Sequence, residues 1–313
     1  MSKTFRLKVK NSYIPWSFLD IIAKEDGLFA KRNISIDFFS VGKTEAEPSD
    51  KIKWYSDLVK TDKLDAYSVC AWGAIDRLAG AETQKEKILA ASTSSSYAFS
   101  IIVQPGLGIK TAKDLAEIPI AVNMKTGSHY CVLSDLERAL PYESIKVVHG
   151  GEPQSRLKGL IDAKFQAVAL ISPYTELAIK LGYPKVAETK TVDVLAFVAR
   201  DDIPMDTMVK YLDALSEASK RLIANPEKYR NLYIRTFRET FAGYPEDLKS
   251  RINKIIDQIG STVPITSWGE LVPYPKESFN QLSTWMSKHN LLQSKVEYEK
   301  IVMQQPLAQA KST

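Results

Sequence analysis

Two histidines and one cysteine are the side chains of this sequence best placed for chemistry, because each lies at a predicted strand end or helix start. They are His129, His149 and Cys70. Imidazole titrates near neutral pH and can act as a general acid or base, and a thiol near a helix N-terminus ionises readily. We expect these three residues to be catalytic only if the protein is an enzyme.

The segment 117–140 predicts a strand, a tight turn and a helix. A β-branched run at 118–122 precedes Thr126, Gly127 and Ser128, and apolar residues then recur at helical spacing. Hydroxyls are available there as helix caps, and the backbone N–H groups at a helix start attract anions. We therefore expect a ligand seat at this turn; the alternative is an ordinary helix cap.

The predicted ligand-binding residues follow predicted strand ends or this helix start. They are Asn11, Tyr13, Trp16, Trp72, Ser94, Asn123, Thr126, Gly127, Ser128, His129, Tyr130, Gly150, Glu152 and Tyr174. The set is polar and aromatic with little charge, which favours a flat or aromatic ligand that stacks on the rings. Core packing is the alternative for each aromatic residue.

Motifs of common catalytic classes are absent from the sequence. It contains no P-loop, GxGxxG, GxSxG or HExxH pattern, so phosphoryl transfer, hydride transfer and α/β-hydrolase chemistry have no support. We predict no metal site, although Cys70, His129 and His149 could in principle meet around zinc or iron. The sequence leaves the cofactor open.

Composition indicates a globular protein that does not bind nucleic acid. The chain has 313 residues, 44% of them hydrophobic, and a net charge of +5 dispersed along the sequence. Two cysteines give no disulfide framework, and no apolar run is long enough to insert into a membrane. The first residues lack a signal peptide, so we expect a cytoplasmic protein as given, or a periplasmic one if a leader has been removed.

Strand and helix patterns alternate along most of the chain and predict an α/β fold. The order at the start is βαβαβαββ, and a second α/β round follows residue 104. Apolar strands near residues 102 and 197 flank that round. We therefore predict two lobes, with residues 1–103 and 195–313 in lobe 1 and residues 104–194 in lobe 2.

Four segments resemble one protein family: GLFAKRNISIDFFSV, IKTAKDLAEIPIAV, TGSHYCVLSDLE and RLKGLIDAKFQAVAL with the following SPYTELAIKLG. They are similar to type II periplasmic solute-binding proteins of ABC transporters, in the nitrate, sulfonate, taurine and thiamine-pyrimidine-precursor branch. Ala167 and Val168 replace the acidic residue usual in the last segment. The resemblance implies a two-lobed fold with two crossover strands, a small-molecule ligand in the interlobe cleft and, if the protein is exported, an ABC permease as partner.

Cytoplasmic enzymes share that fold, so the resemblance leaves the question of catalysis open. They include decarboxylase-like proteins, a sulfinate desulfinase, a dehydratase and a pyrimidine synthase. The desulfinase pattern needs a cysteine where this sequence has Tyr13, and the cysteine-rich run of the pyrimidine synthase is absent. The two hypotheses are a binding protein for an anionic or aromatic ligand and a cytoplasmic enzyme that uses cleft histidine or cysteine residues.

Overall fold

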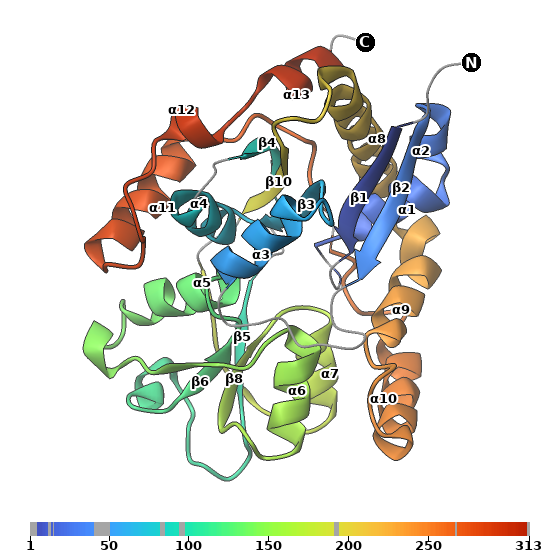
Figure 1. The fold of residues 1–313 in the computed structure, drawn as a ribbon. Helices are drawn as coiled ribbons and strands as arrows, with labels where there is room; N and C mark the ends of the chain where they lie inside the picture. The colour runs from blue at the N-terminus through green and yellow to red at the C-terminus, as the bar shows by residue number, and fades with distance from the viewer. Residues whose placement is uncertain are drawn as a thin grey trace.

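The computed structural model describes residues 5–11, 14, 16–40, 51–81, 85–93, 98–190, 194–266 and 268–311. These residues form two α/β lobes, drawn in the upper and lower halves of Figure 1, and each lobe is built around a five-stranded mixed sheet. The α/β fold expected from the sequence is confirmed.

The sheet of lobe 1 is composed of strands from both ends of the chain. Its order is β2 (Ile34–Ser40), β1 (Phe5–Asn11), β3 (Ala66–Cys70), β10 (Val194–Arg200) and β4 (Glu86–Thr93). β1 runs parallel to β2 and β3, whereas β10 runs antiparallel to β3 and β4. The returning strand β10 is thus inserted between two strands of the first half.

The sheet of lobe 2 repeats this plan. Its order is β7 (Val147–His149), β6 (Ile120–Val122), β8 (Ala167–Leu170), β5 (Ser100–Val103) and β9 (Lys185–Glu188). β6 runs parallel to β7 and β8, and β5 runs antiparallel to β8 and β9. In both sheets the parallel strands end at the edge that faces the other lobe.

Helices cover both faces of the sheets, which explains why the central strands are continuous apolar runs. Every residue of β3 and β8 is buried, and apart from Ser68 in β3 the side chains of both strands are apolar or aromatic. The helices of lobe 1 are α1 (Phe18–Glu25), α2 (Leu28–Lys31), α3 (Lys51–Lys60), α4 (Ala71–Gly80), α8 (Met205–Ala224), α11 (Lys276–Lys288), α12 (Tyr298–Ile301) and α13 (Gln305–Ala310). Those of lobe 2 are η1 (Ala112–Leu115), α5 (Gly127–Leu136), η2 (Tyr142–Ser144), α6 (Pro153–Ile161) and α7 (Tyr174–Lys180).

The strand–turn–helix expected at 117–140 is present as β6 and α5. The helix begins where predicted, with Thr126 as its N-cap residue, but it ends at Leu136 rather than at Leu140. Pro141 follows Leu140 directly, and proline disfavours the helical conformation of the residue before it. The last turn of the predicted helix is therefore replaced by irregular turns.

Two segments connect the sheets, one between β4 and β5 and one between β9 and β10. β5 pairs with β8 and β9 in the second sheet, and β10 begins at Val194 in the first. The lobe boundaries predicted at 103/104 and 194/195 stay a prediction. Among the described helices, none is long and apolar enough to cross a membrane.

The chain between α8 and α11 extends down to lobe 2 (Figure 1). It forms η3 (Pro226–Tyr229), α9 (Arg230–Glu239) and α10 (Glu246–Ile259), and α10 packs against α7. Tyr174 of α7 makes edge-on contacts with Phe237 and Phe241, with ring centroids 5.0 and 6.0 Å apart. These aromatic contacts join the C-terminal segment to lobe 2.

A carboxyl group is completely buried in lobe 1. Asp20 of α1 accepts hydrogen bonds from the Tyr211 hydroxyl at 2.6 Å and the Ser68 hydroxyl at 3.2 Å. Burial disfavours the charged form and outweighs both hydrogen bonds, so the pKa of Asp20 rises from about 3.8 to about 6. Because the folded state holds this proton more tightly than the unfolded state, the associated stability is present below pH 4 and is lost as pH rises through 6.

We expect Asp20→Asn to gain stability relative to the wild type as pH rises. The difference in the free energy of unfolding should grow by about 2 kcal/mol between pH 4 and pH 7.5, since the amide has no charge to bury. Chemical denaturation at several pH values measures it.

Asp26→Asn is the matched control. Asp26 also accepts a tyrosine hydroxyl, that of Tyr229 at 2.7 Å, but Arg221 lies beside it. Burial is outweighed there by these partners and the pKa of Asp26 is lowered, so the stability that this carboxylate contributes is complete above about pH 4 and is lost only at lower pH. The control should therefore be less stable than the wild type by a nearly constant amount between pH 4 and pH 7.5. Parallel pH profiles for Asp20→Asn and the wild type would contradict the burial argument.

Candidate functional site

A cavity lies between the lobes at the carboxyl ends of the parallel strands. Lobe 1 lines it with Lys10, Trp16, Tyr55, Ser68, Val69, Cys70 and Arg77, and lobe 2 with Asn123, Thr126 and Glu152. Its volume is about 30 Å³, which is enough for ordered water. Open α/β sheets hold their ligands at such strand ends, and the described residues leave only this small space there.

The wall of lobe 1 is positively charged. Arg77 lies two turns into α4, is only 3% exposed, and places its guanidinium carbon 3.8 Å from the ring centroid of Tyr55. The Nζ atom of Lys10 lies 5.2 Å from the same centroid. Both cations therefore interact with the π face of one ring.

Arg77 has hydrogen-bonding capacity to spare. Its Nε and Nη1 atoms are buried and, among the residues that the structure describes, have no hydrogen-bond partner. Burial opposes the charge of Arg77, but the Tyr55 phenol and other acidic groups nearby outweigh it, so the pKa of the guanidinium lies above its ordinary value. The cavity thus contains a permanent charge with two unused donors.

Cys70 connects the two lobes. It is the N-cap residue of α4, and its Sγ atom accepts the Gly73 N–H at 3.3 Å. The same Sγ atom accepts the Gly127 N–H, at the start of α5, at 2.9 Å. Two helix N-termini, one from each lobe, thus donate to this sulfur, an arrangement that stabilises a thiolate over a thiol.

The wall of lobe 2 is formed by the turn before α5 and the start of α6. Asn123 Nδ2 donates to Glu152 Oε1 at 3.2 Å, and the Asn123 N–H donates to Ser128 Oγ at 2.9 Å. The Thr126 hydroxyl, which the sequence makes available as a cap, does not cap α5, because it donates to the Asn123 carbonyl instead. The Cys70 sulfur of the other lobe occupies the position of a cap for Gly127.

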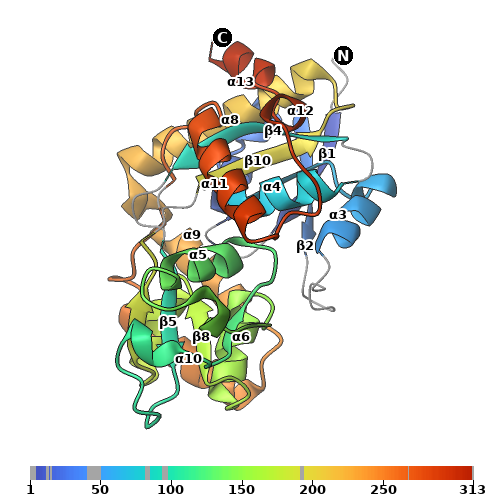
Figure 2. The same ribbon diagram turned by 90° about the vertical axis from the view of Figure 1, so that its left-hand side faces the viewer.

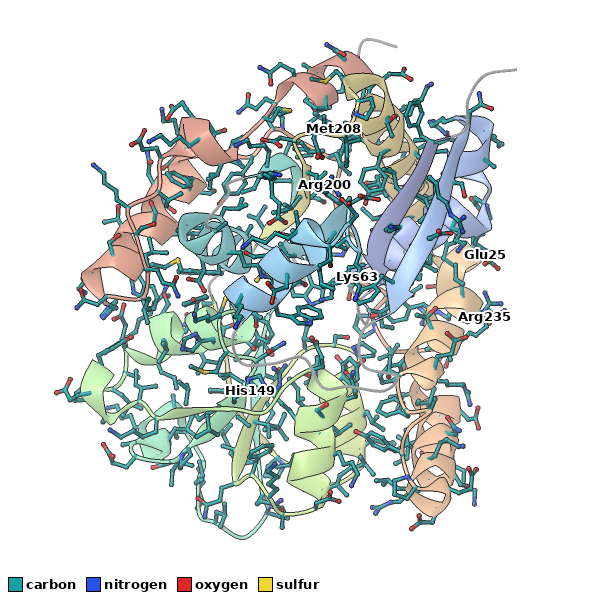
Figure 3. All side chains as sticks on the ribbon, in the orientation of Figure 1. Glu25, Lys63, His149, Arg200, Met208 and Arg235 are labelled. Carbon is teal, nitrogen blue, oxygen red and sulfur yellow. The ribbon has the colours of Figure 1, made fainter. Side chains whose placement is uncertain are left out.

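The two candidate histidines act as hydrogen-bond acceptors outside the cavity lining. His129 Nδ1 accepts the Lys125 N–H at 3.3 Å, and His149 Nδ1 accepts the Met124 N–H at 3.4 Å. Burial and the Lys125 charge lower the pKa of His129 to about 4, so this ring is neutral at pH 7 with its proton on Nε2. Figure 3 shows His149 in the lower lobe. Within the described ranges, no three or more histidine, cysteine, aspartate or glutamate side chains come together in a group that could hold a metal ion, and this holds for Cys70 and the two histidines too.

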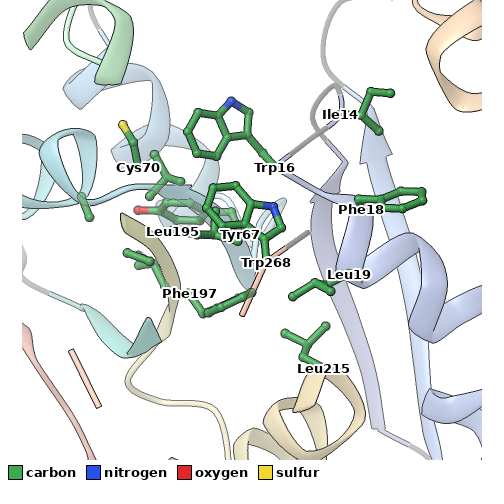
Figure 4. Close-up of a cluster of buried hydrophobic side chains, with 14 of the residues drawn as sticks. Ile14, Trp16, Phe18, Leu19, Tyr67, Cys70, Leu195, Phe197, Leu215 and Trp268 are labelled. Atoms are coloured by element: carbon green, nitrogen blue, oxygen red, sulfur yellow. The ribbon is translucent and has the colours of Figure 1, made fainter. Parts of the chain in front are cut away.

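Five residues predicted from the sequence line the cavity: Trp16, Cys70, Asn123, Thr126 and Glu152. Trp16 stacks on Trp268 with 5.7 Å between ring centroids (Figure 4).

The other described candidates do not line the cavity. They are Asn11, Trp72, Gly127, Ser128, His129, Tyr130, His149, Gly150 and Tyr174. Gly150 lies against Ala121 and Arg156, where an added Cβ would come within 2.9 Å of both side chains. Tyr13 and Ser94 lie outside the described residues, and the ligand contacts of all these residues stay predictions.

Sequence reasoning missed the residues that give the cavity its charge and much of its lining: Lys10, Tyr55, Ser68, Val69 and Arg77. Arg77 had one detectable signal, because it is the cation of an Asp–Arg pair within the mainly apolar helix AWGAIDRLAG. Tyr55 had no such signal in the sequence, since it lies inside the helix α3 and not directly after a predicted strand end.

Solved structures show what this architecture is. The alkanesulfonate-binding protein SsuA of Xanthomonas axonopodis pv. citri, bound to MOPS, superposes with a TM-score of 0.70 at 15% identity over 97% of this chain and 100% of that one. This chain has the periplasmic-binding-protein fold. The two-lobed fold implied by the family resemblance is therefore confirmed.

Two further neighbours with this fold have different descriptions. The Candida albicans CA3427 gene product, described as having the generic periplasmic-binding-protein fold, matches at TM-score 0.66 and 12% identity over 96% of each chain. The desulfurization enzyme DSZB matches at 0.62 and 13% identity over 98% of this chain and 99% of that one. No family model and no curated protein matches the sequence.

In this periplasmic-binding-protein fold, direct bonds hold the lobes together beside the cavity. The Tyr130 hydroxyl of α5 donates to Asp76 of α4 at 2.7 Å, and the Trp285 indole of α11 donates to Glu137 at 2.6 Å. Figure 2 shows α5 directly below α4 and α11. The structure is thus a closed state with bonds that must break when the lobes separate.

We expect Tyr130→Phe to shift the protein toward a more open form, because the substitution removes one interlobe hydrogen bond of about 1–2 kcal/mol and little volume. The radius of gyration from small-angle X-ray scattering should increase. Tyr229→Phe is the matched control, since its bond to Asp26 has the same length of 2.7 Å but lies within lobe 1. Equal radii for both variants would contradict a role of Tyr130 in closure.

Proposed function

We propose that this protein binds a small molecule with an anionic group between its lobes. The observation that carries the proposal is Arg77, which lines the cavity and whose buried Nε and Nη1 atoms have no hydrogen-bond partner among the described residues. A buried charge is costly unless it is paired, and guanidinium groups pair best with carboxylates, sulfonates and phosphates. Lys10 adds a second positive charge, and the rings of Trp16 and Tyr55 suit an apolar or flat ligand body.

Binding requires the lobes to separate and close again. A cavity of about 30 Å³ cannot admit such a molecule from solvent, so the ligand enters an open form and the closed form surrounds it. If a leader precedes this sequence, the protein is periplasmic and an ABC permease recognises the closed form. Without a leader the same binding takes place in the cytoplasm.

Catalysis at Cys70 is a second candidate, favoured by the two N–H groups that donate to its sulfur. In that case the protein is a cytoplasmic enzyme on this fold, and the Cys70 thiolate adds to a carbonyl carbon of the bound ligand while the π electron pair of the C=O bond moves onto its oxygen. The neighbour DSZB is an enzyme with this architecture. His129, neutral at pH 7, would then serve as a hydrogen-bonding group rather than as an acid.

The binding proposal is tested with butane-1-sulfonate, benzoate and benzenesulfonate as probes in calorimetric titrations. We expect Arg77→Met to weaken the probes that bind by about 30- to 150-fold, or about 2–3 kcal/mol, through loss of charge-assisted hydrogen bonds. Arg77→Lys should weaken binding by an intermediate factor, because the positive charge remains but the two-pronged donor geometry of the guanidinium is lost. Arg138→Met, at a side chain 59% exposed, is the control; equal affinities for all variants would refute the anion site.

The catalytic candidate is tested by the pH dependence of alkylation with iodoacetamide, followed by mass spectrometry. An ordinary thiol reacts about 50-fold faster at pH 8.5 than at pH 6.5, whereas a stabilised thiolate at Cys70 should gain less than about 5-fold. Cys131, which is buried in α5 and does not line the cavity, reports on general opening of the protein. An ordinary 50-fold rise at Cys70 would remove the basis of this candidate.

A further inference from the structure

The two walls of the interlobe cavity have opposite polarity. Arg77 and Lys10 of lobe 1 present only hydrogen-bond donors and positive charge, whereas Glu152 and Asn123 of lobe 2 present oxygen acceptors. An anion satisfies the first wall alone. The chemistry of the second wall therefore defines a further part of the ligand.

The acceptors of lobe 2 are buried and unused. Asn123 is 2% exposed, and its Oδ1 atom has no hydrogen-bond partner in the described part of the chain. Its Nδ2 atom donates to Glu152 Oε1, which fixes the orientation of the amide. The second carboxylate oxygen, Oε2, is likewise without a partner among the described residues. Two acceptor atoms on adjacent side chains thus remain for a donor from the ligand.

The walls do not neutralise each other directly. Arg77 and Glu152 line the same cavity, yet the Arg77 Nε and Nη1 atoms and Glu152 Oε2 find no partner within the ranges that the structure describes. A ligand with only an anionic group would pair with Arg77 but would lie close to the Glu152 carboxylate, where like charges repel. A ligand with a positive group at its other end would pair with both walls.

We infer that the ligand is a small zwitterion, with its anionic group at Arg77 and Lys10 and an ammonium group at Glu152 and Asn123. This inference rests on the proposed binding function and adds the second charged group to it. Specificity then comes from the Glu152 carboxylate, because an analogue without the ammonium group leaves this carboxylate buried and unpaired.

The test compares probes of equal size that differ in one ammonium group. The pairs are 4-aminobutanoate with pentanoate, 3-aminopropane-1-sulfonate with butane-1-sulfonate, and 4-(aminomethyl)benzoate with 4-ethylbenzoate. Calorimetric titration of the full chain should give at least about tenfold tighter binding of the amino member of a pair. Glu152→Gln should reduce that preference to about threefold or less.

Two further variants separate charge from structure. Glu152→Gln combined with Asn123→Asp returns a carboxylate to the same wall with the side-chain hydrogen bond reversed, and it should restore the preference. Glu176→Gln is the matched control, because Glu176 is another lobe 2 carboxylate with an unpartnered oxygen but does not line the cavity.

The outcomes distinguish the inference from the proposed function. If both members of a pair bind equally and Arg77→Met weakens both, the zwitterion is overturned and anion binding stands. If Glu152→Gln leaves the preference intact, the assignment of the ammonium site is overturned. If neither member of any pair binds, both the inference and the proposed function are overturned.

Discussion

The relative position of the two lobes at the cavity depends on one contact, in which the N-termini of two helices meet at a single sulfur atom. α4 begins after Cys70 in one lobe, α5 begins at Gly127 in the other, and the Cys70 sulfur accepts an N–H from each. Helix N-termini carry partial positive charge, so their approach is unfavourable without an electron-rich atom between them. The sulfur fills this role, and the cavity forms beside it.

Electrostatics at this junction underlies both proposals, ligand binding and catalysis at Cys70. The positive wall of lobe 1 and the two helix ends favour negative charge, which a ligand anion or the Cys70 sulfur itself can supply. These two uses compete, because a thiolate already compensates part of the positive field that would hold an anion. The charge state of the Cys70 sulfur therefore distinguishes the two proposed functions, binding of an anion and catalysis.

Much of the fold was predictable from the sequence, because the central strands β3, β8 and β10 are apolar runs and α5 follows a recognisable turn. The edge strand β9 was missed, since its residues KVAE are partly exposed and lack an apolar pattern.

The cavity was less predictable than the fold. Reasoning from strand ends found Cys70, Asn123 and Glu152, but it could not find Tyr55 or Arg77, which come from helix interiors. It also placed Tyr174 at the ligand, whereas this ring is buried in the contact with α9. Strand ends are local features of a sequence, but the face that a helix turns toward another lobe depends on tertiary packing.

The C-terminal segment determines in which direction the lobes can part. Tyr174 packs on Phe237 and Phe241, and the Tyr244 hydroxyl donates to the Gln154 carbonyl of lobe 2. A separation of the lobes that preserved these contacts would open them on the opposite side in Figure 1, where α5 lies below α4 and α11. Under the proposed function that side would be the entrance, and the side chains on its rim would be the first that an incoming molecule encounters.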